Sequence, residues 1–311
     1  LTGGQAGIET DNTYGNARIV SIRPDRILDR LEQGYVVIVP GFQGVTPDGD
    51  ITTLGRGGSD TTAVALGAAL GAERVDIFTD VDGILTADPR LVEQARRLDR
   101  VTYSEISNMA ISGAKVIHPR AVEIAKQARL PLRVRSTFGD DEGTLVYDDD
   151  RQPGSHGKIA DRYVTGIAHV ANVTQITVPN PDQRFDMQYQ VFRAMAEQAI
   201  SVDFINVNPS GIVYTVPDDV SGEAEAALRQ LGCNPVLLKD CAKVSVIGGG
   251  IHGVPGIMAR IAGALTREDI TILQSADSNA TIWVLVRGNQ MVQALRALHS
   301  EFGLDKMANQ A

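Results

Sequence analysis

Residues 52–65, TTLGRGGSDTTAVA, place three glycines around Arg56 and lead into an apolar run typical of a helix. Glycines let the backbone turn its amides inward and let a ligand approach closely. Ser59 or Asp60 is predicted to cap the helix. The free amides and positive dipole at a helix start favour an anion, and the Arg56 guanidinium could hold a carboxylate through two parallel hydrogen bonds. A plain glycine-rich turn needs none of these side chains, so we interpret the stretch as an anion site.

A second polar stretch, DVDGILTADPR, follows the apolar run VDIFT and spans residues 80–90. Acids and a glycine at the carboxyl end of a strand lie where open α/β sheets bind ligands. Two interpretations stay open. Asp80, Asp82 or Arg90 contacts a nucleotide or metal, or the stretch is a polar turn with a helix starting at Asp88 and Pro89.

The stretch GAKVIHPRAVEIA adds a lysine and a histidine. Lys115 could meet a phosphate, although its spacing alone favours an ordinary solvated lysine. His118 has no cysteine or histidine nearby, so we assign it to no metal. Gly113 is expected to turn the chain, and Pro119 suits the first turn of a helix.

The elements that position these residues alternate between strands and helices. Continuous β-branched runs predict buried parallel strands, and Tyr35–Pro40 (YVVIVP) is one of them. The alternation through residue 147 implies a mainly parallel sheet with helices on its faces. The expected strands are 17–22, 35–40, 75–79 and 131–137; the expected helices are 24–33, the run from the glycine loop to about 71, 91–94, 103–112 and the run from 119; and 41–50 is expected to be loop and turn.

The pattern changes after a polar stretch at 148–161 that is rich in glycine and proline, which we interpret as a linker. Beyond it, a β-α-β-β-α-β unit of roughly 70 residues occurs twice, which indicates a repeat. Within the second copy Gly248, Gly250 and Gly253 spell the dinucleotide fingerprint GxGxxG. The 58 residues that follow are too few for a doubly wound sheet, so we do not favour a nicotinamide-dependent enzyme.

Composition narrows the functional classes. A net charge of −9 argues against non-specific nucleic-acid binding. Two cysteines without a CxxC pair suggest a reducing compartment, the cytoplasm. No apolar run approaches the roughly 20 residues that span a bilayer, and no signal-peptide pattern opens the chain. The start at LTGGQAGIETD, without methionine and already rich in glycine, looks like a truncation.

Five motifs in this order, GFQG, TTLGRGGSDTTA, FTDVDGILTADPR, GAKVIHPRAVEIA and PLRVRST, resemble the aspartokinases of the amino-acid-kinase superfamily. The tail resembles their paired ACT domains, with ISVDFINVNPS, CAKVSVIG and ILQSADSNATIWVLV most similar to the diaminopimelate-sensitive type of Gram-positive bacteria. The resemblance implies an α/β fold: a three-layer, carbamate-kinase-like amino-acid-kinase domain, N-terminally truncated, and two ferredoxin-like ACT domains. The expected boundaries are 1–147 for the kinase domain, 148–163 for the linker, and 164–240 and 241–311 for the ACT regions, with the first strand free to join the second ACT domain.

The resemblance also implies an activity. Aspartokinases transfer the γ-phosphoryl group of ATP, with Mg²⁺, to the β-carboxylate of L-aspartate. The product, 4-phospho-L-aspartate, begins lysine, threonine, methionine and diaminopimelate synthesis. The alternative is a non-catalytic regulatory subunit that binds amino acids. Neither a nucleic acid nor a membrane is expected as a partner, and ACT pairing implies a homodimer.

Site residues follow from the resemblance alone. The aspartate site is expected at Arg56, Gly57, Gly58 and Ser59, with Asp60 as the catalytic residue. The nucleotide is expected at Thr79, Asp80, Leu85, Arg90, Lys115 and Val116, although Leu85 stands where the family often has an aromatic residue. An effector (lysine, threonine or diaminopimelate) is expected near Asp203, Asn206, Asn208, Gln274 and Ser275, unless these polar residues merely end strands. No protein metal ligands are expected.

The family's KFGG-type lysine, which touches the transferred phosphate, has no counterpart in the sequence. The acidic residue that binds the substrate amine is also missing. Losing one charge that clamps a phosphate costs on the order of 10²–10³ in rate. We therefore expect the 311-residue chain by itself to be a weak or inactive kinase.

Overall fold

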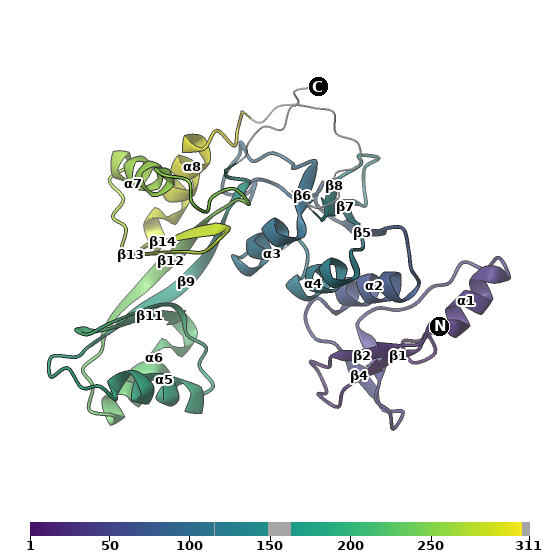
Figure 1. Ribbon diagram of the computed structural model, residues 1–311, viewed down its shortest axis with the longest axis horizontal. Coiled ribbons are helices and arrows are strands. Elements are labelled where there is room, and N and C mark those ends of the chain that lie inside the picture. Colours follow the sequence, from purple (N-terminus) through teal and green to yellow (C-terminus); the bar gives the residue numbers. More distant parts are fainter. Residues whose placement is uncertain (115, 149–162, 307–311) are drawn as a thin grey trace. The chain divides into compact units, whose positions relative to one another are not determined.

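The computed structural model describes residues 1–114, 116–148 and 163–306 (Figure 1). The chain forms two compact units, each described here by itself. The first holds Leu1–Pro89 and Gln94–Thr165, and the second holds Arg90–Glu93 and Gly166–Ala311. The predicted linker at 148–163 lies outside the described residues except for its two ends.

A four-stranded sheet of order β2-β1-β3-β4 forms the N-terminal part of the first unit. Its strands are β1 (Ile8–Thr10), β2 (Ile19–Ile22), β3 (Gln43–Val45) and β4 (Ile51–Thr53). β1 is parallel to β3, and the other neighbours are antiparallel. The expected helix at 24–33 is confirmed as α1 (Asp25–Glu32), whose Ile27 packs with Ala6 and Ile8 in a buried cluster.

A second four-stranded sheet of order β5-β7-β8-β6 completes the first unit. Its strands are β5 (Val75–Thr79), β6 (Arg100–Thr102), β7 (Leu132–Ser136) and β8 (Thr144–Tyr147). β5 and β7 are parallel, as are β6 and β8, but β7 and β8 are antiparallel. The expectation of one mainly parallel sheet is therefore wrong, because the connection at 137–143 is too short for a parallel crossover.

Three helices accompany this sheet: α2 (Gly58–Ala69), α3 (Tyr103–Ile111) and α4 (Pro119–Ala128). α4 packs against both α2 and α3 (Figure 1). A capping box starts α3, in which the Thr102 hydroxyl accepts from the Glu105 amide while the Glu105 carboxylate accepts from the Thr102 amide. Pro119 is the first residue of α4, as predicted.

Three local predictions are wrong. Tyr35–Pro40 is not a strand, and although Val37 and Val39 pack on the core, Val36 and Ile38 are 90% and 78% exposed. The β-branched run is thus buried on one side only. Residues 91–94 form a turn, because their few residues and the preceding Pro89 do not nucleate a helix. Residues 43–45, expected as loop, are strand β3, while the turn that follows them is as predicted.

The second unit is built on a six-stranded sheet of order β10-β11-β9-β12-β14-β13. Helices α5 and α6 lie on one half of the sheet and α7 and α8 on the other (Figure 1). The strands are β9 (Gly166–Pro179), β10 (Asp203–Asn208), β11 (Gly211–Pro217), β12 (Val236–Ile247), β13 (Gln274–Asp277) and β14 (Thr281–Arg287). The helices are α5 (Met187–Glu197), α6 (Ser221–Gln230), α7 (Ile257–Arg267) and α8 (Met291–Glu301), with 3₁₀ turns η1 (Asp218–Val220) and η2 (Gly288–Gln290).

The two copies of the repeat share their central strands. The later part of β9 pairs with β11 and with the start of β12, whereas Gly166–Val170 pairs with Lys243–Ile247 at the end of β12. After α8, residues 302–306 add no strand among the described residues. The second copy thus takes its fourth strand from β9 rather than from its own end, and the two copies form one sheet.

Candidate functional site

The glycine loop that the sequence singles out ends at the start of α2. Gly57 is the N-cap residue, with a left-handed φ of 70°, and no side chain caps the helix. The prediction that Ser59 or Asp60 caps it is therefore wrong, because both lie within the first turn. Within the described part of the chain, the amides of Ser59 and Asp60 have no hydrogen-bond acceptor. Free amides at the positive end of a helix are suited to binding an anion.

Two side chains from distant parts of the sequence pack on this loop. The His118 ring fills the space that a side chain at Gly57 would need, and a Cβ on Gly58 would lie 2.6 Å from Phe42 Cδ2. The His118 amide donates to Asp60 Oδ2 at 3.2 Å. Phe42 has a φ of 75°, an unfavourable conformation for a bulky residue, and its amide donates to Thr62 Oγ1 at 3.1 Å. The loop is held in one conformation by these contacts.

Arg56 and Ser59 are exposed on this loop. Among the described residues, Arg56 has neither an ion pair nor a hydrogen bond. Its guanidinium is therefore free to bind a carboxylate with its planar fork. Arg56 in the loop and Ser59 in the first turn of α2 thus lie on either side of the Gly57 cap, and their roles remain predictions.

The carboxyl ends of β5 and β7 form a second polar edge. Thr137 donates to the Thr79 carbonyl through its amide, at 2.8 Å, and through its hydroxyl, at 3.0 Å. The Thr79 hydroxyl donates to Asp80 Oδ1 at 3.1 Å, and Asp80 is exposed. Residues 80–90 contain no helix, so the predicted helix start at Asp88 and Pro89 is wrong. The residues expected at the nucleotide begin where two parallel strands end.

The other residues expected to contact the nucleotide are Leu85, Arg90, Lys115 and Val116. Leu85 is half-buried and pairs through a single bridge with Arg97. Val116 is half-buried, two residues before His118. Lys115 lies outside the described residues, and Arg90 is grouped with the second unit. Thr79, Asp80 and Leu85 thus lie in the first unit, on β5 and the segment that follows it.

The carboxylate of Asp76, near the start of β5, forms ion pairs with two arginines. Asp76 accepts from Arg133 Nη2 at 2.5 Å and from Arg74 Nε at 2.7 Å. Burial acts to raise the pKa of Asp76, but the hydrogen bonds from Arg133 and Arg74 outweigh it and hold that pKa below its ordinary value. The pair fastens β5 to β7 beneath the edge that carries Thr79.

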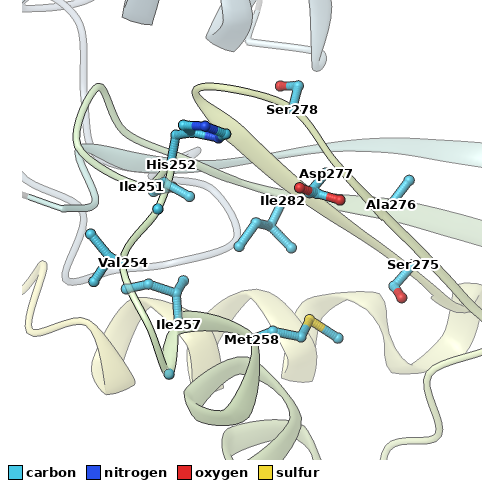
Figure 2. Close-up of a pocket in the computed structure, with 12 residues that line it drawn as sticks. Ile251, His252, Val254, Ile257, Met258, Ser275, Ala276, Asp277, Ser278 and Ile282 are labelled. Carbon is cyan, nitrogen blue, oxygen red and sulfur yellow. The ribbon is translucent and has the colours of Figure 1, made fainter.

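The second unit contains a cavity of about 390 Å³ between α7, the loop before it and strand β13 (Figure 2). Figure 2 shows Ile251, Val254 and Ile257 on one side and the polar Ser275 and Asp277 on the other. Gly256 caps α7 with a left-handed φ of 91° and no side-chain cap. The cavity is lined by Ile251, His252, Gly253, Val254, Gly256, Ile257, Met258, Ser275, Ala276, Asp277, Ser278 and Ile282. It combines a helix N-terminus, a carboxylate and an apolar wall, which together suit a small zwitterion.

Of the five expected effector residues, only Ser275 lines this cavity. Asp203 forms an ion pair with the nearly buried Lys243, and the Gln274 side chain donates to the Phe204 carbonyl. Asn206 and Asn208 are exposed on β10, where Asn208 Oδ1 accepts from the Ser210 amide at 3.0 Å. The structure therefore brings Gln274 next to Asp203, through the Phe204 carbonyl, while Ser275 lines the cavity and Asn206 and Asn208 are exposed on β10.

The loop GxGxxG is part of the cavity wall. It follows β12, whose neighbours β9 and β14 are both antiparallel to it. A dinucleotide fold needs parallel strands at this point, so the nicotinamide alternative is wrong. In the described residues, no helix has the length and apolarity to cross a membrane.

Comparison with known proteins gives two family matches: the Amino acid kinase family over residues 1–136 and the ACT domain over residues 236–300. Aspartokinase 1 of Bacillus subtilis (strain 168) is 53% identical over 307 residues, which make up 98% of this chain and 76% of that protein. The chain belongs to the aspartokinase family. An aspartokinase of Thermus thermophilus is 41% identical over 314 residues, covering 97% of this chain and 76% of its own length.

Solved structures agree. Aspartokinase III of E. coli, in complex with aspartate and ADP, superposes with a TM-score of 0.78 at 30% identity, covering 97% of this chain and 69% of that one. Clostridium acetobutylicum aspartate kinase gives a TM-score of 0.79 at 25% identity, covering 90% and 66%. The fold expected from the resemblance, a kinase domain followed by ACT domains, is confirmed. A kinase is favoured over a separate regulatory subunit, because the kinase match covers the glycine loop.

Proposed function

We propose that the complete product of the gene that encodes this chain catalyses ATP-dependent phosphorylation of the β-carboxylate of L-aspartate, yielding 4-phospho-L-aspartate, while the 311-residue chain by itself is a weak or inactive kinase. The observation that carries the proposal is that Arg56 and the neighbouring amides at the start of α2 have no partner within the described part of the chain. The E. coli relative binds aspartate and ADP, which supports the same substrate pair here.

In this proposal the glycine loop binds the amino-acid substrate. Arg56 and Ser59 bind a carboxylate of aspartate together with the backbone at Gly57 and Gly58, whose missing side chains leave the space that His118 and Phe42 occupy. Asp60, fixed by the His118 amide at 3.2 Å, acts at the reacting end by orienting the phosphates or the groups that bind them. The protein's contribution is positioning and charge neutralisation.

The nucleotide is proposed to lie along the edge at Thr79 and Asp80, with Leu85, Arg90, Lys115 and Val116 as further contacts. The residues present fit a magnesium nucleotide, because Mg²⁺ in such sites takes one or two carboxylates together with the phosphates. Asp80 and Asp82 offer those carboxylates on a single loop. When bound, Mg²⁺ supplies neutralising charge for the phosphates.

The reaction is a direct phosphoryl transfer. A β-carboxylate oxygen of aspartate attacks the γ-phosphorus in line, a new O–P bond forms, and the bond from the γ-phosphorus to the bridging oxygen of ADP breaks. No covalent intermediate on the protein is needed. The negatively charged aspartate and triphosphate repel each other. Arg56 and the α2 amides offset this repulsion and hold aspartate close to the γ-phosphorus.

The test uses the complete product of the gene that encodes this chain, incubated with ATP, Mg²⁺ and aspartate, with hydroxylamine to trap the acyl phosphate. Aspartyl hydroxamate is expected, and Arg56→Glu is expected to lower kcat/KM for aspartate on the order of 10²-fold or more. Arg26→Glu, which makes the same charge change at an exposed position on α1, is the matched control. Unchanged kinetics in Arg56→Glu would remove the proposal.

We also propose that the second unit binds an amino-acid effector and pairs two chains into a homodimer. The ACT match and the polar and apolar lining of the cavity at Ser275 and Asp277 support the first part. The E. coli relative, solved with lysine and aspartate, superposes with a TM-score of 0.77 at 30% identity.

The domain boundaries remain part of this proposal: kinase domain 1–147, linker 148–163, and ACT regions 164–240 and 241–311. Calorimetry with lysine, threonine and diaminopimelate tests it, and sedimentation tests the dimer.

A further inference from the structure

Two buried carbonyls mark the point where the glycine loop leaves the first sheet. β4 ends at Thr53, whose carbonyl accepts from the Ala17 amide at 2.9 Å. Among the residues that the structure describes, no backbone amide donates to the next carbonyl, that of Leu54, or to the carbonyl of Ala17. Both residues are fully buried. A buried carbonyl without a donor costs about 1–3 kcal/mol, so a donor is needed here.

Arg120, in the first turn of α4, supplies both hydrogen bonds. Its Nη1 donates to the Leu54 carbonyl and its Nη2 to the Ala17 carbonyl, each at 3.1 Å. A planar guanidinium can reach two acceptors at fixed separation, whereas a lysine ammonium is a point donor on a flexible stem. The Arg120 side chain therefore replaces the strand pairing that ends at Thr53.

His118, two residues before Arg120, contacts the other end of the glycine loop, where α2 begins. The His118 ring packs on Gly57, the His118 amide donates to Asp60, and His118 Nδ1 accepts from the Arg120 amide at 3.3 Å. Residues 118–120 thus fix the loop at its base, through Leu54, and at its helix end. Arg56 lies between these two anchors and is itself unanchored within the described residues.

We propose that Arg120 is a positioning residue for aspartate: it sets the direction in which Leu54 and Gly55 present Arg56, without touching the substrate itself. The proposal rests on the proposed function of the glycine loop. Since Arg120 acts on the base of the aspartate loop, its loss should affect aspartate far more than ATP.

The test compares Arg120→Lys, Arg120→Met and Arg120→Ala with Arg129→Met, an exposed arginine at the other end of α4. In the complete gene product, Arg120→Met should lower kcat/KM for aspartate on the order of 10²-fold, as displacement of about 1 Å does, with the KM for ATP within about twofold. Arg120→Lys, which keeps the charge but loses the fork, should be impaired nearly as much. Arg129→Met should behave as the unsubstituted protein.

Two further measurements separate positioning from general damage. Millimolar guanidinium chloride should restore part of the aspartate kcat/KM of Arg120→Ala, while an equal concentration of sodium chloride should not. In the 311-residue chain, amide exchange at residues 54–60 should quicken at least tenfold in Arg120→Met, and exchange in α3 should not change. An equal loss for both substrates, no rescue, or unchanged exchange at 54–60 each overturns the proposal. If the unsubstituted protein lacks kinase activity, the proposed function fails, while the exchange result still decides whether Arg120 holds the loop.

Discussion

Two helices, one in each unit, begin in the same way. Gly57 caps α2 with a φ of 70° and Gly256 caps α7 with a φ of 91°, and neither helix has a side-chain cap. Both backbones leave amides at the positive end of a helix open to a ligand. The glycines allow the left-handed cap that an ordinary side chain disfavours.

The surroundings of these two caps differ. A side chain at Gly57 would overlap the His118 ring, whereas one at Gly256 would meet nothing within 4 Å. The first loop is packed by residues from other elements, and the second faces a cavity. A loop that aligns reacting atoms needs a single conformation, whereas a loop that admits a regulator needs room. The same local backbone therefore serves two purposes, which the packing around it decides.

The largest expected effect is at the packed cap. Gly57→Ala should lower kcat/KM for aspartate on the order of 10²–10³-fold, because the added methyl must displace His118 and the alanine resists a φ of 70°. Steady-state kinetics in the complete gene product measures this. Wild-type kinetics in Gly57→Ala would mean that the loop is as open as the one before α7.

A smaller effect is expected on the cavity side. Asp277→Asn should weaken inhibition by the effector about tenfold, the value of one hydrogen bond to a charged group, and leave activity without effector unchanged. Inhibition curves with lysine, threonine and diaminopimelate measure it, with Asp269→Asn, which does not line the cavity, as the control. A loss of basal activity in Asp277→Asn would contradict the separation of the two loops.

The open cap itself should tolerate a methyl group. Gly256→Ala should cost about 1 kcal/mol of unfolding free energy, from backbone strain alone, since no atom lies in the way. Uninhibited kinetics should be retained. Urea denaturation followed by circular dichroism gives the first value. A cost as large as that of Gly57→Ala would show that the cap at α7 is packed after all.

The smallest effect concerns how α7 is anchored. Glu301 on α8 accepts from Arg260 Nε at 3.0 Å and also pairs with Arg267. The hydrogen bond from Arg260, together with Arg267, lowers the pKa of Glu301 below its ordinary value of 4.5. Because the pKa of Glu301 is lower in the folded than in the unfolded state, the two ion pairs stabilise the fold at pH values above 4.5. That stabilisation is lost as the pH falls through the lowered pKa.

Glu301→Gln should therefore reduce the unfolding free energy by about 0.5–1 kcal/mol at pH 7, with the difference vanishing in acid below the lowered pKa. Denaturation at several pH values measures this, and Glu197→Gln, in an exposed pair with Arg193, is the matched control. A difference that grows in acid would contradict the sign.

Local sequence signals predicted most of the helices and strands but not which residues pack against them. The helices at 25–32, 103–111 and 119–128 and the strands at 75–79 and 132–136 match clear caps and apolar patterns. The run at 35–40 shows that β-branched residues indicate an extended chain without telling what covers it. Arg56 and Ser59 were found because they are adjacent in sequence. Pro119 indicated the start of a helix, but nothing local in the sequence shows that the ring of the preceding His118 packs on Gly57.

The register of β9 and β12 has one more consequence. Gly166, the first residue of β9, pairs with Ile247, the last residue of β12 before the cavity loop. The residue after the Thr165–Gly166 peptide therefore pairs with the strand residue that precedes the loop lining the cavity. Thr165 in turn donates to Glu105 in the capping box of α3. A single peptide bond, between Thr165 and Gly166, therefore connects the residue that contacts the capping box of α3 to the first residue of β9.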